Sequence, residues 1–298
     1  MTAIPADVAE MAHRGPEWAD WVRALPSTAG ILMRRWGLRP DGTGSACGHC
    51  SLVLPVRTDD GVSAVLKIGF PDRESAHEHL ALRRWDGAGA VRLLAAEPHL
   101  RGLLLERLHR EDLSGVPEER ACEVVAGLYR RLHVPAMPAL RALSDFVGEQ
   151  TADLSNLPRS APIPRRLVEQ AIALGGELCC EGSGADRVLH TDLHYANVLA
   201  ADREPWLAID PKPLNGDPHY ELAPMLWNRW EEIGADVRAG VRRRLWALAE
   251  AAGMDQDRAR AWVLVRMVHN AMWAVRDGPR ADRSWLTVCV AVAKAVAD

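Results

Sequence analysis

The spacing of hydrophobic and polar positions changes twice along the chain. Residues 5–26 have helical spacing and form a preface rich in Trp and Ala. From Ile31 onward, short apolar and β-branched runs are separated by the turn sequences DGTG and DDG, which predicts a meander of antiparallel strands. The predicted strands are ILMRRWGL, SLVLPVRT, SAVLKIGF and two more on either side of Pro98. One predicted helix, in RESAHEHLALRRWDG, interrupts them and stops at Gly87.

The pattern after Leu108 is mainly helical. In PEERACEVVAGLYRRLH the apolar residues recur at the i, i+3, i+4, i+7 spacing of one buried face. The same spacing returns in RRLVEQAIALGGEL, VRAGVRRRLWALAEAA, RARAWVLVRMVHNAMWAV and LTVCVAVAKAVA. A chain of 298 residues is long enough for two domains. We predict an α/β (α+β) protein with a helical preface and β-rich lobe at residues 1–108 and an α-helical lobe at residues 109–298.

Composition and charge exclude several classes of protein. The net charge of −4 argues against a nucleic-acid partner, which would need a strongly basic face. The first two dozen residues are acidic and contain no apolar core of a signal peptide. The most apolar late stretch is interrupted by Arg266, His269 and Asn270, which indicates a buried helix and no membrane span. We expect a cytoplasmic protein, and nothing indicates an obligate protein partner.

The tetrapeptide Cys47-Gly48-His49-Cys50 has the spacing of a disulfide-exchange motif. Such a motif needs its first thiol at the N-terminus of a helix, where the thiol pKa is lowered. Here a turn sequence precedes the cysteines and the strand pattern SLVLPV follows them. We therefore interpret the tetrapeptide as a loop tip, and we expect reduced thiols without a redox role.

The segment from His190 to Lys212 concentrates polar side chains between two short apolar runs. VLAAD and PWLAID predict a hairpin, and a turn at Asp202 to Pro205 would place Asn197 opposite Asp210. Opposed side chains in such a ladder have Cβ atoms about 4.5–5.5 Å apart. An amide oxygen beside a carboxylate suits Mg²⁺, which prefers oxygen ligands. Asp192, on the loop that leads into the hairpin, is a candidate base close to this metal.

Two other interpretations of this segment stay open. His190, Asp192 and His194 alternate, and on a strand they would share a face as ligands of a transition metal. A polar hairpin whose Asp caps a turn needs no function at all. Nearby, Asp217 precedes Pro218 and is expected to cap a helix and to brace the catalytic loop, with Glu221 on the first turn.

The pattern His-x-Asp-x₄-Asn, followed by an Asp after a hairpin, resembles the catalytic and metal loops of protein-kinase-like phosphotransferases. The resemblance implies a two-lobed protein-kinase-like fold with a small antiparallel β lobe and a larger helical lobe. It also implies that Asp192 is the catalytic base and that Asn197 and Asp210 are Mg²⁺ ligands.

The resemblance extends to the β-rich lobe. Lys67 in AVLKI matches the lysine that holds the α- and β-phosphates of ATP, and it is one of only three lysines in the chain. Glu78 matches its ion-pair partner, with Glu74 as the alternative. The family's adenine-binding hinge corresponds to residues 104–108, which implies nucleotide contacts by Glu106 and Leu108.

Several motifs of the chain differ from those of protein kinases, and these differences indicate which family the chain resembles more closely. No G-x-G-x-x-G is present, and GTGSACGHCS offers a shorter loop in which Ser45 would meet phosphate. Asp210 is followed by Pro-Lys, and no activation segment follows. These features are similar to aminoglycoside phosphotransferases. LHTDLHYANVL, AIDPKPLNGDPHYELAPMLWNRW and ALRRWDGAGAVRLL resemble the streptomycin 6-phosphotransferase and hydroxyurea phosphotransferase branch.

The resemblance implies an ATP- and Mg²⁺-dependent kinase that phosphorylates a hydroxyl of a small polar antibiotic, with streptomycin as the favoured acceptor. A cationic acceptor would be held by Asp192 and by acids of the helical lobe, for which Glu231, Glu232 and Asp236 are the candidates. Hydroxyurea or an endogenous metabolite is the alternative acceptor. A kinase-like binding module without catalysis is the alternative from another class, and the sequence does not distinguish ATP from GTP.

Overall fold

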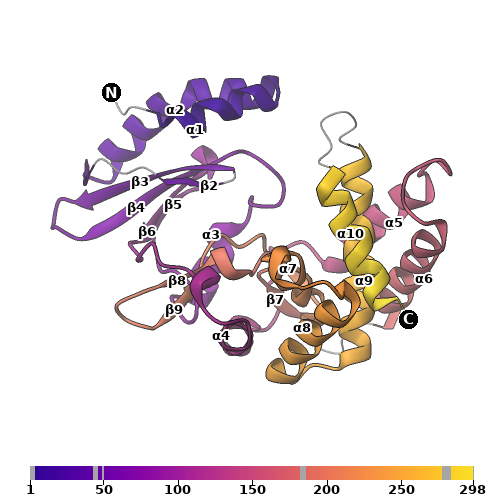
Figure 1. The fold of residues 1–298 in the computed structure, drawn as a ribbon. Coiled ribbons are helices and arrows are strands. Elements are labelled where there is room, and N and C mark those ends of the chain that lie inside the picture. The colour runs from indigo at the N-terminus through magenta and orange to yellow at the C-terminus, as the bar shows by residue number, and fades with distance from the viewer. Residues whose placement is uncertain (1–3, 43–45, 49, 182–185, 277–282, 298) are drawn as a thin grey trace. The chain divides into compact units, whose positions relative to one another are not determined.

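The computed structural model describes residues 4–42, 46–48, 50–181, 186–276 and 283–297 (Figure 1). By its internal contacts the chain divides into two compact units, residues 1–109 and residues 110–298. The first unit contains a six-stranded sheet, and the second is mostly helical. Within the described residues, no helix is both long and apolar enough to span a membrane.

In the first unit, two helices precede the sheet along the chain, and a third follows the fourth strand in sequence. The helices are α1 Ala6–Glu10, α2 Pro16–Arg35 and α3 Glu78–Trp85, with 3₁₀ turns η1 Met11–Arg14 and η2 Pro98–Leu100. The strands are β1 Leu38–Pro40, β2 Ala46–Gly48, β3 Ser51–Thr58, β4 Ser63–Gly69, β5 Leu93–Glu97 and β6 Gly102–Glu106. They pair in the order β1-β3-β4-β6-β5, with β2 added to β3, and every described pair is antiparallel as predicted.

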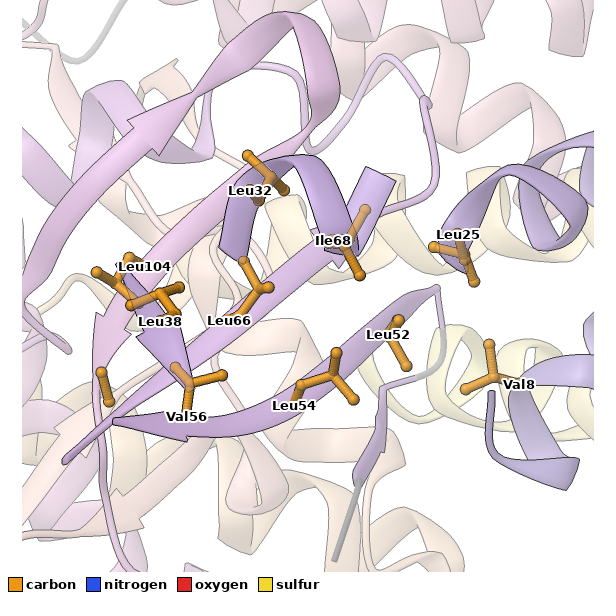
Figure 2. Packing of buried hydrophobic residues seen from close by; sticks show 12 residues of the cluster. Val8, Leu25, Leu32, Leu38, Leu52, Leu54, Val56, Leu66, Ile68 and Leu104 are labelled. Carbon is orange, nitrogen blue, oxygen red and sulfur yellow. The ribbon is translucent and has the colours of Figure 1, made fainter. Parts of the chain in front are cut away.

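Helix α2 covers one face of this sheet and forms the core of the first unit (Figure 2). Residues 25, 29 and 32 of the helix are buried against alternate residues of β3 and β4. Gly102 lets helix and sheet approach closely, since a Cβ there would lie 2.5 Å from a methyl carbon of Leu32. Side chains alternate along a strand, so Leu66 and Ile68 face α2 and Lys67 between them points to the opposite face.

The prediction of a strand at ILMRRWGL was wrong for most of its length. Helix α2 continues to Arg35, and only Leu38 at the end of the run enters β1. The apolar residues Leu25, Ala29 and Leu32 extend one helical stripe through the region. Their burial against the sheet outweighs the β-type character of the local sequence. Pro26 lies inside α2 without ending it.

In its described residues the second unit combines six longer helices and one short helix with two small antiparallel ladders. Its helices are α4 Glu118–Leu132, α5 Leu143–Ser155, α6 Arg165–Glu181, α7 Ala223–Trp227, α8 Val237–Ala252, α9 Gln256–Arg276 and α10 Arg283–Val296. Its 3₁₀ turns are η3 Leu113–Gly115, η4 Tyr195–Asn197, η5 Pro218–Leu222 and η6 Trp230–Glu232. Its strands are β7 Arg187–Leu189, β8 Val198–Ala200, β9 Trp206–Ala208 and β10 Leu214–Gly216, which pair as β7-β10 and β8-β9.

These elements position the polar segment from His190 to Lys212. Apolar residues of α5, α6 and α9 pack around Leu189 of β7, which directly precedes the segment, and around Tyr220 of η5, which follows it. The helices predicted at α4, α6, α8, α9 and α10 are present, whereas α5 was not predicted. Helix α5 contributes Phe146 and Val147 to the core.

Candidate active site

The first unit contains a buried ion pair between Lys67 and Glu78. Lys67 lies on β4, and its Nζ is 2.7 Å from both carboxylate oxygens of Glu78 at the start of α3. The two side chains are only 10% and 6% exposed. Glu74, the alternative partner, is exposed. Burial of two charges costs desolvation energy, so a buried pair is weak evidence for stability and draws attention to function.

The other predicted nucleotide contacts lie at the end of β6 and before β2. Residues 103–105 pair with β4 on one side and β5 on the other, so the sheet uses their main-chain groups. Glu106 N–H donates to Arg92 O at 3.0 Å, and its carboxylate accepts from Arg92 N–H at 2.6 Å. Leu108 lies two residues beyond the strand and is half-buried. Ser45 lies outside the described residues.

The predicted hairpin is present in the second unit, but its register differs by one residue. Ala200 pairs with Trp206 and Val198 with Ala208, because the loop has five residues where four were predicted. Asn197 therefore meets Ile209, whose N–H donates to Asn197 O at 2.9 Å. Asp210 follows that contact and leaves the ladder in the left-handed conformation, with φ 61°. The direct opposition of Asn197 and Asp210 was wrong, although the two residues remain close along this end of the hairpin.

Asp192 is held at its main chain and at its side chain. Asn197 Nδ2 donates to Asp192 O at 2.8 Å, and Lys212 Nζ lies 2.9 Å from Asp192 Oδ2. The Asp192 side chain is 19% exposed, so solvent or a ligand can still reach it. Because the Asn197 amide nitrogen is engaged, the position of its Oδ1 is fixed by the same contact. An amide oxygen and the Asp210 carboxylate are chemically suitable ligands for Mg²⁺, which usually takes few protein oxygens and keeps several waters.

Thr191, the residue before Asp192, is also left-handed, with φ 61°. Its N–H donates to Glu221 Oε1 at 3.1 Å, and its hydroxyl donates to Lys212 O at 2.6 Å. Its carbonyl accepts a hydrogen bond from Arg266 of α9. A β-branched residue rarely adopts this conformation, so three distant partners are needed to hold it.

The histidines of the segment form hydrogen bonds with main-chain groups. His190 is fully buried, its Nε2 is 2.9 Å from Ile209 O, and its Nδ1 accepts from Asp192 N–H at 3.3 Å. His194 Nδ1 accepts from Ala196 N–H at 3.3 Å. Burial lowers the pKa of both histidines, which favours their neutral form. Among the described residues, no three His, Cys, Asp or Glu side chains form a metal-binding group, and residues 190–194 do not lie on the strand that the transition-metal interpretation required.

Glu221 braces the loop that contains Asp192, a role that the sequence suggested for Asp217. Oε1 of the buried Glu221 accepts from the N–H groups of both His190 and Thr191. Burial alone would raise the Glu221 pKa, but His133, 3.6 Å away, and these donors lower it below its usual value. Asp217 does cap η5 as predicted, since its Oδ1 accepts from His219 N–H at 3.0 Å.

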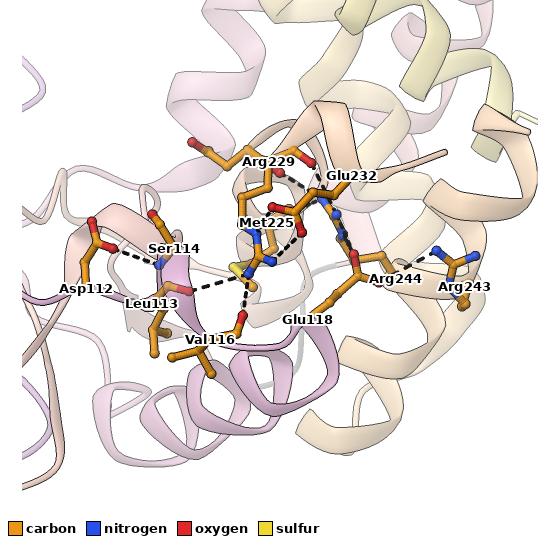
Figure 3. Close-up of polar contacts among 11 residues, drawn as sticks. Asp112, Leu113, Ser114, Val116, Glu118, Met225, Arg229, Glu232, Arg243 and Arg244 are labelled. Atoms are coloured by element: carbon orange, nitrogen blue, oxygen red, sulfur yellow. Dashed lines mark hydrogen bonds and ion pairs between the residues drawn. The ribbon is translucent and has the colours of Figure 1, made fainter. Parts of the chain in front are cut away.

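Two of the predicted acceptor-binding acids have structural partners, and Figure 3 shows those of Glu232. Arg229 Nε donates to Glu232 Oε1 at 2.7 Å, and this hydrogen bond lowers the pKa of Glu232. The same arginine donates to Val116 O at 2.6 Å, which ties η6 to the start of α4. Asp236 Oδ1 caps α8 by accepting from Ala239 N–H at 3.0 Å. Glu231 is exposed on η6.

The sequence reasoning missed Lys212, Glu221 and Arg266 as residues of this site. The scarcity of lysine was a usable signal for Lys212, as it was for Lys67. An acid four residues after Asp217 gave no comparable signal, because both acids fit the first turn of a helix. Arg266 lies 75 residues from Thr191 along the chain, and only the tertiary fold brings them together.

Comparison with known proteins gives consistent matches. A family profile described as aminoglycoside/hydroxyurea antibiotic resistance kinase matches residues 35–278. The chain is 44% identical over 293 residues to a streptomycin 6-kinase of Streptomyces glaucescens, covering 94% of each chain. It is 45% identical over 289 residues to a hydroxyurea phosphotransferase of Kitasatospora aureofaciens, covering 92% of this chain and 81% of that enzyme.

A solved structure shows the same fold at low identity. A thermostable mutant of aminoglycoside phosphotransferase APH(4)-Ia, in ternary complex with ADP and hygromycin B, matches with a TM-score of 0.60 and 17% identity. The match covers 90% of this chain and 98% of that one. The predicted protein-kinase-like fold and the predicted branch are both confirmed. The chain belongs to the family of aminoglycoside and hydroxyurea antibiotic resistance kinases.

Proposed function

We propose that this kinase transfers the γ-phosphoryl group of ATP to a hydroxyl of streptomycin, with Asp192 as the group that accepts the hydroxyl proton. The observation that carries the proposal is the fixed position of Asp192, which Asn197 and Lys212 hold. Asn197 and Asp210 are the proposed oxygen ligands of Mg²⁺. Family membership supplies the reaction class, and the 44% identity to a streptomycin 6-kinase favours this acceptor.

The β-rich lobe, residues 1–108, is proposed to bind the nucleotide. Lys67 would neutralise the α- and β-phosphates while Glu78 fixes the position of its ammonium group. Ser45, Glu106 and Leu108 are the proposed contacts to phosphate and adenine. A structural relative with ADP bound supports the use of a nucleotide.

The helical lobe, residues 109–298, is proposed to carry the chemistry and the acceptor site. Asn197 and Asp210 would hold Mg²⁺, which when bound offsets the charge of the triphosphate. As the acceptor oxygen bonds to the γ-phosphorus, the bond from phosphorus to the β–γ bridging oxygen breaks. The hydroxyl proton passes to Asp192, and ADP leaves with the electron pair. Asp192 and Glu231 are the proposed acceptor contacts. Glu232 and Asp236 are less available to the acceptor, because Glu232 pairs with Arg229 and Asp236 caps α8.

Hydroxyurea is the second candidate acceptor, because the chain is 45% identical to a hydroxyurea phosphotransferase. Both acceptors offer a hydroxyl, but they differ in size and charge. A panel of streptomycin, hydroxyurea and other small hydroxyl compounds, assayed with Mg²⁺-ATP by ADP release, distinguishes them. ADP release that depends on streptomycin supports the proposal, and release that depends on hydroxyurea alone would replace the acceptor while keeping the reaction.

An Asp192→Asn variant tests the site itself. Turnover should fall about 10²–10⁴-fold, the usual contribution of a positioned acid–base group, while ATP affinity stays close to wild type. Asp202→Asn, at an exposed aspartate of the hairpin loop, is the matched control and should retain normal turnover. Near-normal turnover of a folded Asp192→Asn protein would remove Asp192 from the catalytic role.

A further inference from the structure

The loop that follows Asp210 is fastened to the catalytic loop at three points, all through one residue. Lys212 N–H donates to His190 O at 3.0 Å, and Lys212 O accepts from Thr191 Oγ1 at 2.6 Å. Its side chain crosses to Asp192, where Nζ is 2.9 Å from Oδ2. Pro211 and Pro213 flank Lys212, and each proline ring restricts φ, so the loop is locally stiff.

We propose that Lys212 is a positioning residue for phosphoryl transfer. Its ammonium group binds one carboxylate oxygen of Asp192, so that the other oxygen faces the acceptor hydroxyl. This inference rests on the proposed role of Asp192.

The geometry of a carboxylate explains why such a partner is needed. Asp192 has two equivalent oxygens, and rotation of the carboxylate would exchange them. Asn197 fixes the main chain of Asp192 through its carbonyl, but that contact leaves the side chain free to turn. The contact from Lys212 to Oδ2 selects one orientation. Because small displacements from the reactive geometry cost large factors in rate, holding this orientation raises turnover.

The charges at the site give a second reason why Asp192 needs a cationic partner. The carboxylate of Asp192 must approach the acceptor hydroxyl while that hydroxyl meets an anionic phosphoryl group. A cation bonded to the carboxylate offsets the repulsion between the two anions. The Lys212 side chain is 38% exposed and that of Asp192 is 19% exposed, so the pair is partly removed from solvent and is screened less than a surface pair.

The identity of the cation matters in this arrangement. Lysine presents a compact charge that binds a single oxygen, whereas the planar fork of arginine binds both oxygens of a carboxylate. A bidentate arginine at position 212 would occupy the oxygen that Asp192 needs for the acceptor. This chain has only three lysines among its 36 Lys and Arg residues, so a lysine at this place is unusual for its composition.

Steady-state kinetics of Lys212→Met test the proposal, with Lys294→Met as the matched control at the exposed lysine of α10. We expect Lys212→Met to lower kcat about 10²-fold, with KM for ATP and acceptor within about threefold of wild type and an unchanged melting temperature. Lys212→Arg keeps the charge but should stay at least tenfold below wild type. Lys294→Met should match wild type.

A second variant leaves both charged groups in place. Thr191→Val removes only the hydroxyl that fastens the Lys212 carbonyl and keeps a β-branched side chain. We expect kcat to fall about tenfold, and Thr191→Ser should restore it. If Lys212→Met does not fold, the comparison of Thr191→Val with Thr191→Ser tests the proposal instead.

Three results would overturn the role of Lys212: a kcat within threefold of wild type for Lys212→Met, a change confined to KM, or full activity of Lys212→Arg. If Lys212→Met does not fold, an unaltered kcat for Thr191→Val would also overturn the role of Lys212. A wild-type protein without turnover on any acceptor contradicts the proposed function. An active wild type with an equally active Lys212→Met contradicts only the inference about Lys212.

Discussion

The carboxylate oxygen Oε1 of Glu221 accepts a hydrogen bond from the main-chain N–H of Thr191 at 3.1 Å. This contact joins η5 to the residue before Asp192, and Glu221 is completely buried. Thr191 has φ 61°, a conformation that costs on the order of 1–3 kcal/mol for a residue with a β-branched side chain. The buried carboxylate therefore stabilises a strained main-chain geometry on which the direction of Asp192 depends.

We predict that Glu221→Gln lowers both stability and turnover. The amide oxygen of Gln can still accept from Thr191 N–H, but the hydrogen bond loses its charge. A hydrogen bond to a charged group contributes about 1–1.5 kcal/mol more than a neutral one, so the free energy of unfolding should fall by about that amount at neutral pH. Turnover of the folded variant should fall about 10²-fold, because the catalytic loop is less well positioned. Denaturant unfolding and steady-state assays measure the two effects.

The control for this variant is Glu169→Gln on α6, where the side chain is 63% exposed and pairs with Arg165 at 3.0 Å. An exposed pair of this kind contributes about 0–1 kcal/mol, and the substitution lies outside the catalytic loop. If Glu221→Gln were as stable and as active as Glu169→Gln, the brace would be unimportant.

The lowered pKa of Asp217 predicts that the free energy of unfolding depends on pH. Burial raises the pKa of its carboxyl, but hydrogen bonds from His219, Trp262 and Arg258 outweigh burial and bring the pKa well below its ordinary value of 3.8. A carboxyl whose pKa is depressed by folding stabilises the native state above its unfolded pKa. That contribution is lost as the pH falls below about 4 toward the lower native value.

Comparison of wild type with Asp217→Asn isolates this contribution. The difference in unfolding free energy should be about 1.5–3 kcal/mol between pH 5 and 7, because the asparagine gives up charged hydrogen bonds, and it should shrink progressively below about pH 4. Asp257→Asn, at a side chain of α9 that is 91% exposed, is the control. A difference that stays constant from pH 7 to pH 3 would contradict the assigned cause.

The contacts of the site differ in how far local sequence determines them. The ion pair of Lys67 and Glu78 joins a strand to the helix that follows it, and a lysine inside an apolar strand is conspicuous in this chain. The order Asp192, Asn197, Asp210 was visible because the motif spacing lies within one loop and one hairpin.

The register of the hairpin was not determined by local sequence. The local sequence is compatible with a loop of four or of five residues. A loop of four would place Asn197 opposite Asp210, whereas the observed loop of five, Ala201 to Pro205, places it opposite Ile209. A contact outside the hairpin holds the observed loop, since Arg131 of α4 binds Glu204 with both terminal nitrogens. The brace by Glu221 likewise depends on the packing of η5 beside β7, which no local pattern reports.

We predict that the cysteines of the CGHC tetrapeptide are dispensable. Cys47 lies on β2, where it pairs with Leu52 of β3, and Gly48 pairs with Ser51 of the same strand. A strand gives none of the thiolate stabilisation that a helix N-terminus provides. The Cys47→Ala/Cys50→Ala variant should have turnover within about twofold of wild type, as for ordinary surface substitutions.

Assays with and without dithiothreitol complete the test of the cysteines, and wild-type turnover should be equal in both. Loss of activity in a folded double variant, or a strong dependence on the reductant, would show that these thiols take part in function.

The last prediction concerns the acceptor. Streptomycin carries two guanidinium groups, and exposed carboxylates would hold them by interactions that salt screens. The Debye length falls from about 30 Å at 0.01 M salt to about 8 Å at 0.15 M, so KM for streptomycin should rise across this range. Glu231 is an exposed candidate on η6, and Glu231→Gln should raise that KM and weaken its salt dependence.

Hydroxyurea provides the internal comparison, because a neutral acceptor has no charge for salt to screen. Its KM should stay nearly constant over the same range, and Glu231→Gln should leave it unchanged. Glu169→Gln on α6 controls for the loss of one surface charge. A salt-independent KM for streptomycin would falsify recognition by exposed carboxylates, since the affinity would then have to come from neutral contacts or from buried groups. Turnover of hydroxyurea without turnover of streptomycin would assign the enzyme to the other acceptor, with Asp192 and its partners unchanged in their roles.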